Sequence, residues 1–131
     1  MIVDSSVFIS FYSEADVHHK EAVEIFKKIE NSGQIIISDY ILNEIISVLL
    51  RKFGLKNSLE VLDAILNSSS LYIRHTSEEE FYEIVEVFKN QKDNLSFIDC
   101  SILWLAIKSN LEINTFDKNL KKEILNKKKI K

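Results

Sequence analysis

The chain has 131 residues, of which 46% are hydrophobic and 28% charged, a composition typical of a globular protein of one domain. Its formal net charge of −3 argues against tight, non-specific binding of nucleic acid, and its apolar runs are too short for a membrane-spanning helix. A single cysteine, Cys100, and an N-terminus without a signal-peptide pattern favour a cytoplasmic location with no membrane attachment.

The first half of the chain alternates between strand and helix patterns. The β-branched run QIIIS is typical of a strand that is buried on both faces in a parallel sheet. In chain order, we expect a strand over 1–3, a short helix or turn over 5–12, a helix over 17–31 capped by Asp16, a strand over 34–38, a helix over 40–53 capped by Ser38 or Asp39 and ended by Gly54, and a helix over 58–67.

The second half continues the alternation. Thr76 or Ser77, followed by Glu79 and Glu80, resembles a capping box that opens a helix. The expected elements are a strand over 71–75, a helix ending near 90, a helix over 96–109, a strand over 111–116 and a last short helix from Asp117 or Lys118. The whole pattern predicts an α/β fold with a mostly parallel sheet of four or five strands covered on both faces.

Positive charge is concentrated at the C-terminus. Residues 117–131 carry seven lysines against two acids, whereas residues 1–116 carry ten basic residues against eighteen acidic ones. A basic chain end can contact phosphate, or it can simply be solvated. We therefore expect one domain over 1–131, with a lysine-rich tail over 118–131 that could be partly disordered.

Two acids directly follow predicted strands. Asp4 ends the first strand and Asp117 ends the last, and the carboxyl ends of strands in an open α/β sheet are where functional groups gather. Each acid alone could equally be a helix N-cap. Their position at the same sheet edge predicts that the two carboxylates lie close together.

Two further acids lie on predicted helices that are largely apolar. Glu44 stands at the edge of an apolar helix face. It could belong to a functional site, or it could simply form an ion pair with a nearby cation. Asp99 stands in LSFIDCSILWLAI, where it could also be the third residue of a capping box begun by Ser96. Four like charges near a core need protonation or a cation. Oxygen ligands favour Mg²⁺ or Mn²⁺, while one cysteine and three dispersed histidines give no convincing zinc site.

Four motifs resemble the PIN domain family, and most closely its VapC-type ribonuclease toxins: VDSS, LNEIISVL, LSFIDCSIL and NTFD. The resemblance extends over essentially the whole chain and implies a three-layer α/β/α PIN-like domain. It implies an acidic site that holds Mg²⁺ or Mn²⁺, made of Asp4, Glu44, Asp99 and Asp117, with Ser6 and Thr115 as supporting hydroxyls. His18 and His19, which also occur at this place in PIN-like sequences, are expected on a helix surface without a catalytic role.

The same resemblance implies the function. The protein would be a metal-dependent endoribonuclease that cuts tRNA or rRNA, and the toxin of a type II toxin–antitoxin pair. Its partners would be a cognate antitoxin protein and a second copy of the chain in a homodimer, although Phe53, Leu55 and Leu59 could equally belong to the core. RNA would be held by local basic residues, namely Arg51, Lys52, Lys118, Lys121 and Lys122. The alternatives are a non-catalytic PIN-like module that binds RNA or protein, and a receiver-type signalling domain, which would need paired acids early in the chain.

Overall fold

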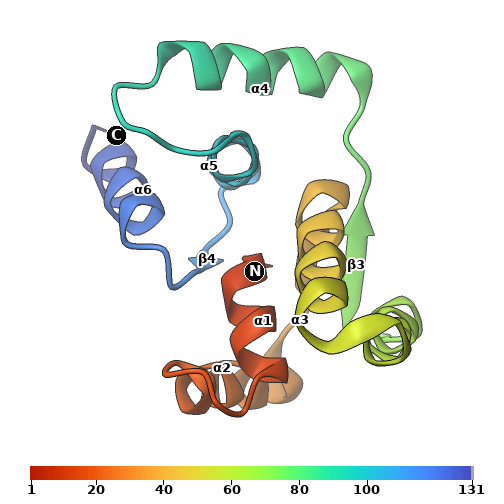
Figure 1. Ribbon diagram of the computed structural model, residues 1–131. Helices are drawn as coiled ribbons and strands as arrows, with labels where there is room; N and C mark the ends of the chain where they lie inside the picture. The colour runs from red at the N-terminus through yellow and green to blue at the C-terminus, as the bar shows by residue number, and fades with distance from the viewer. Residues whose placement is uncertain (131) are drawn as a thin grey trace.

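A four-stranded sheet forms the centre of the computed structural model, which describes residues 1–130 (Figure 1). The strands are β1 (Ile2–Val3), β2 (Ile35–Ser38), β3 (Leu71–Arg74) and β4 (Ile113–Asn114). Their order across the sheet is β3-β2-β1-β4, and every neighbouring pair is parallel. The predicted α/β fold with a parallel sheet is confirmed.

Helices connect the strands and cover the sheet. They are α1 (Ser5–Tyr12), α2 (His19–Ser32), α3 (Asp39–Leu66), α4 (Glu78–Asn90), α5 (Phe97–Ser109) and α6 (Lys118–Ile130). In Figure 1, α4 crosses the top of the molecule between the end of β3 and the segment that leads into α5. Within the part of the chain that the structure describes, no helix is both long and apolar enough to cross a membrane.

Both faces of the sheet are covered, which makes the fold three-layered. Successive side chains of a strand point to opposite faces. Ile2 and Val3 in β1 are both fully buried, and Ile37 and Ser38 in β2 are also buried on their two faces. Burial of neighbouring strand residues requires helices on each side of the sheet, as the β-branched sequence of β2 predicts.

Side-chain caps set most of the helix starts that the sequence predicts. Ser38 Oγ accepts the Ile41 N–H at 3.2 Å, and Ser77 forms the predicted capping box with Glu80. The helix predicted over 17–31 is present as α2, but its predicted cap is wrong, because the helix begins at His19 rather than just after Asp16. The Asp16 carboxylate instead accepts the His18 N–H at 2.8 Å, in the turn that precedes the helix.

Gly54 bends α3, so the two helices predicted for this region form one element with a kink. Its φ of 86° lies in the left-handed region, where a side chain is strained, although nothing lies within 4 Å of a Cβ added there.

We expect Gly54→Ala to lower the free energy of unfolding by about 1–3 kcal/mol through backbone strain alone. Gly33→Ala is the matched control, since Gly33 has an extended φ of −161° and equally open space. Urea unfolding of both variants checks this, and equal stabilities would contradict it.

The C-terminal elements differ from the prediction. β4 is only two residues long, because the backbone beyond Asn114 leaves the sheet ladder: the Phe116 N–H donates to Ser6 Oγ at 3.1 Å and the Asp117 N–H to Thr115 Oγ1 at 3.0 Å. Helix α6 is longer than the short helix expected and extends through most of the lysine-rich segment. Lys131, the last residue of the predicted tail, lies outside the described residues.

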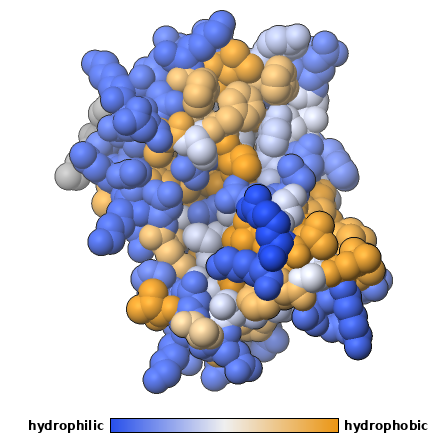
Figure 2. Space-filling model, viewed as in Figure 1, coloured by the Kyte–Doolittle hydropathy of each residue, from blue (hydrophilic) through white to orange (hydrophobic). Residues whose placement is uncertain are grey.

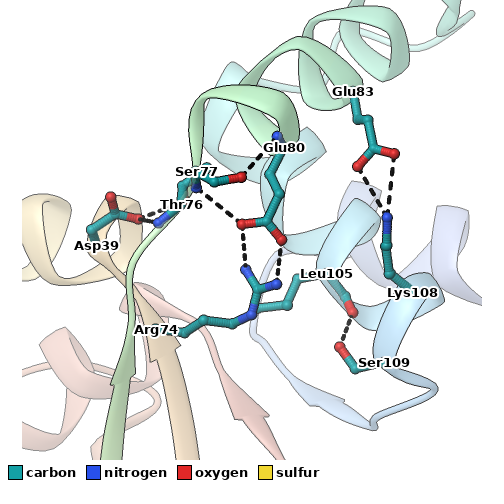
Figure 3. A network of polar contacts seen from close by, with 9 residues as sticks. All are labelled: Asp39, Arg74, Thr76, Ser77, Glu80, Glu83, Leu105, Lys108 and Ser109. Carbon is teal, nitrogen blue, oxygen red and sulfur yellow. Dashed lines mark hydrogen bonds and ion pairs between the residues drawn. The ribbon is translucent and has the colours of Figure 1, made fainter.

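Ion pairs connect β3, α4 and α5, as Figure 3 shows. Arg74 in β3 makes a two-pronged contact with Glu80 in α4, and Lys108 in α5 pairs with Glu83 at 3.1 Å. Arg74 and Lys108 also lie over the ring of Trp104, at 5.5 and 5.3 Å from its centroid. The hydrogen bond from Arg74 is the main reason that the pKa of Glu80 is lowered. These contacts fix α5, which carries Asp99, against the rest of the domain.

Candidate acidic site

Asp4 lies at the carboxyl end of β1, where its carboxylate is buried and accepts hydrogen bonds at both oxygens. Oδ1 accepts the Ser5 N–H at 2.7 Å and the Ser5 hydroxyl at 3.3 Å. Oδ2 accepts hydroxyl groups of Ser6 at 3.0 Å and Thr115 at 2.7 Å. Four donors from two segments therefore orient both oxygens of this side chain.

Ser6 and Thr115 also position the turn that carries Asp117. Each hydroxyl donates to Asp4 and accepts a backbone N–H from the turn, Ser6 from Phe116 and Thr115 from Asp117. Asp117 then caps α6, because its Oδ1 accepts the N–H groups of Asn119 at 2.9 Å and Leu120 at 3.0 Å. Capping uses one carboxylate oxygen and leaves the second for another ligand.

Asp99 stands in the first turn of α5, where its N–H donates to Ser96 Oγ at 3.1 Å, as the capping-box interpretation predicts. Burial raises the pKa of its carboxyl to about 6, with further contributions from the charges of Asp117 and Asp4. The Asp99 carboxyl is therefore close enough to both of these acids for their charges to act on it.

Glu44 on α3 completes the group. Burial raises the pKa of Glu44, a hydrogen bond from the Ser5 hydroxyl, which Glu44 shares with Asp4, lowers it, and the charge of Asp4 raises it. The charge of Asp4 thus acts on both helical acids, and that of Asp117 acts on Asp99, so these pairwise interactions connect all four predicted residues.

The raised pKa of Asp99 gives a pH dependence with a definite sign. The pKa of Asp99 in the folded protein is about 6, above its ordinary 3.8. The contribution of protonated Asp99 to folding stability is therefore complete below about pH 4 and is lost as the pH rises through 6. In chelator, wild type should therefore lose roughly 1–2 kcal/mol of stability across this window relative to Asp99→Asn, after allowance for solvent screening. Urea unfolding at a series of pH values measures the difference, and parallel pH profiles would contradict it.

The negative charge and the oxygen atoms of the four acids are suited to bind a cation. Among the described side chains, none of the ion pairs joins a lysine or arginine to Asp4, Glu44, Asp99 or Asp117, so their charges are not offset by the protein. Oxygen donors of this kind suit Mg²⁺ or Mn²⁺. Within the described residues, however, no three acidic, histidine or cysteine side chains already stand in metal-binding geometry. Holding an ion would therefore require Glu44, Asp99 and Asp117 to rotate towards Asp4, which its hydrogen bonds hold in place.

His18 lies beside this site, which the sequence did not indicate. It precedes α2, and its ring stacks on that of Phe116 with centroids 4.6 Å apart. His19 is partly buried and its Nδ1 lies 2.9 Å from the Ser10 carbonyl oxygen, so it is not simply a surface residue. Residues so far apart in the chain as 18 and 116 give no local pattern from which their contact could be predicted.

The strand order and the position of the acids define a class: a parallel α/β domain with a carboxylate cluster at one sheet edge. The PIN domain family model matches residues 1–123, and the chain belongs to this family.

Two known proteins extend the comparison. The chain is 28% identical to a VapC ribonuclease of Archaeoglobus fulgidus over 120 residues, which cover 88% of this chain and 76% of that protein. It superposes on the crystal structure of Mycobacterium tuberculosis VapC20, described as a sarcin–ricin loop cleaving toxin, with a TM-score of 0.84, 18% identity and 93% coverage of each chain. The likeness to VapC20 shows that the two chains share a fold.

Proposed function

We propose that this PIN-domain protein is a metal-dependent endoribonuclease that hydrolyses RNA phosphodiester bonds, and the toxin of a type II toxin–antitoxin pair. The observation that carries the proposal is the gathering of Asp4, Glu44, Asp99 and Asp117, with no ion pair to a cation among the side chains that the structure describes. Such an arrangement costs stability in the free protein and is accounted for by a bound cation. The likeness to a VapC ribonuclease supports the same activity.

In this proposal the four acids would hold Mg²⁺ or Mn²⁺. When bound, such an ion supplies Lewis acidity towards water and the scissile phosphate. Asp4 is the fixed member, because four hydrogen bonds hold its carboxylate. Ser6 and Thr115 support the site by orienting Asp4 and the backbone before Asp117. Asp99 and Glu44 contribute charge from α5 and α3, at the sides of the same site.

Positive charge next to the acids would hold the RNA backbone. Helix α6 begins beside Asp117, and its first lysines, Lys118, Lys121 and Lys122, are exposed. Arg51 and Lys52 are exposed on α3. Lysine and arginine on exposed surfaces neutralise phosphates whatever the base sequence, which lets an acidic protein bind RNA locally.

The proposal includes protein partners. An antitoxin that inserts an arginine or lysine among the acids would neutralise them with charge-assisted hydrogen bonds. A homodimer would cover apolar side chains of α3: Phe53, Leu55 and Leu59 are 39%, 64% and 47% exposed, so they are not part of the core. Figure 2 shows apolar side chains gathered at the lower right, over the second half of α3. The location would be cytoplasmic, where tRNA and rRNA are.

Cleavage of a mixed tRNA and rRNA pool by the purified protein tests the proposal. Parallel reactions contain Mg²⁺, Mn²⁺ or chelator. We expect discrete cuts with either ion and none with chelator. Intact RNA with both ions, from folded protein free of any partner, would contradict the enzymatic function and favour a binding module. Equal cutting in chelator would contradict the role of the metal.

A further inference from the structure

A stacked pair of rings from distant segments borders the acidic site. The planes of His18 and Phe116 are inclined by only 19°, and their centroids are 4.6 Å apart. Phe116 packs against the hydrophobic core, whereas the His18 side chain is 48% exposed. Phe116 is therefore the inner layer, and His18 is the half-exposed outer layer, with its Nδ1 3.8 Å from Glu21 Oε2.

Backbone hydrogen bonds hold both layers in place. The His18 N–H donates to Asp16 Oδ1 at 2.8 Å, and the same oxygen accepts the Ser10 hydroxyl at 3.1 Å. The Phe116 N–H donates to Ser6 Oγ. Because both residues are already fixed, a planar ligand that stacks on His18 would cost little ordering entropy.

The pair is also directly connected to the acids. Phe116 stands between Thr115, which donates to Asp4, and Asp117. The pKa of Asp16 is lowered mainly by the hydrogen bond from His18 and further by the charge of Lys52, so a cation also reaches this corner. A half-exposed aromatic ring, a nearby cation and the proposed phosphodiester site next to them are the elements that bind single-stranded RNA.

We propose that His18, supported by Phe116, is a stacking platform for one nucleobase next to the scissile phosphate. This inference rests on the proposed ribonuclease function and deepens it. His18 would be a positioning residue that holds the RNA strand and selects an unpaired base at one position. Stacking on a ring face tolerates any base, so the platform would select single-stranded structure more than sequence.

Binding of short single-stranded RNAs to Asp99→Asn protein tests the platform without cleavage. 2-Aminopurine is placed at each position in turn, and its fluorescence reports stacking. We expect the fluorescence to be quenched at one position of the RNA. Adding His18→Ala to the Asp99→Asn protein should abolish this quenching, and adding His18→Phe instead should retain it. Affinity should fall about tenfold in His18→Ala, or ~1.4 kcal/mol, which is within the range for one stacked base. An abasic nucleotide at the quenched position should remove the difference between His18→Ala and its parent.

Controls separate stacking from a structural role. Tyr72→Ala removes a 60% exposed ring on the edge strand β3 and should leave both quenching and affinity unchanged. If His18→Ala lowers the melting temperature but leaves the quenching pattern as it was, the pair only joins two loops and the inference is overturned. A parent that binds none of the RNAs overturns the platform and RNA binding together. Metal-dependent cutting of the RNA pool with no effect of His18→Ala on binding overturns the platform alone.

Discussion

Replacing Asp99 by asparagine should lower the rate of RNA cleavage by at least about a thousandfold, equivalent to ~4 kcal/mol of transition-state stabilisation. Asparagine keeps the shape of the side chain but removes a charge that interacts with Asp117 and Asp4. The fold should be retained, because the backbone N–H of residue 99 still donates to Ser96 Oγ and the asparagine carbonyl oxygen can still accept the hydrogen bonds that Ser96 gives the Asp99 carboxyl. Initial cleavage rates with excess Mg²⁺ measure the effect.

The matched control for Asp99→Asn is Asp63→Asn. Asp63 is exposed on the last part of α3, and this variant changes net charge by the same amount. We expect wild-type rates from Asp63→Asn. Wild-type rates from folded Asp99→Asn would remove Asp99 from the site.

Replacing Thr115 by valine should lower cleavage by about 10- to 100-fold, the usual cost of losing a group that orients a metal ligand. Valine matches the shape of threonine but has no hydroxyl. Asp4 Oδ2 would lose its donor at 2.7 Å, and the Asp117 N–H would lose its acceptor at 3.0 Å. Thr115 is buried, so leaving the Asp117 N–H unpaired, and Asp4 Oδ2 with Ser6 as its remaining donor, should also cost about 1–3 kcal/mol of folding stability. Cleavage rates over a Mg²⁺ titration and urea unfolding measure the two effects.

Thr115→Ser separates the hydroxyl from the methyl group. Serine keeps the oxygen that joins Asp4 to Asp117, so we expect this variant to retain activity within a few-fold of wild type, on the order of the cost of one lost methyl contact. If Thr115→Ser is as impaired as Thr115→Val, packing rather than hydrogen bonding would explain the loss.

Local sequence signals account for most of the fold. The run IIIS predicts a strand buried on both faces, and the serines at 38, 77 and 96 predict helix starts, because strand burial and N-capping each depend on a few neighbouring residues. The kink in α3 follows from Gly54, although the sequence alone suggested two helices. The lengths of β4 and α6 could not be predicted, since β4 ends where Ser6, more than a hundred residues earlier, captures the Phe116 N–H.

The candidate site, too, is predictable from the sequence only in part. Asp4 and Asp117 could be paired from the sequence because parallel strands end at one sheet edge. The influence of Asp4 on Glu44, and the hydrogen bond of Glu44 with Ser5, depend on how α3 packs against α1, and no local pattern carries that information. The His18–Phe116 stack likewise exists only in three dimensions.

Calorimetric titration of Mn²⁺ into the metal-free protein tests most directly the claim that four acids form one cation site. We predict saturable binding by wild type and weaker binding by every single variant in which one acid is neutralised, namely Asp4→Asn, Glu44→Gln, Asp99→Asn and Asp117→Asn. Asp63→Asn should bind as wild type does. An absence of binding by wild type, or undiminished binding by the four variants, would contradict a shared metal site.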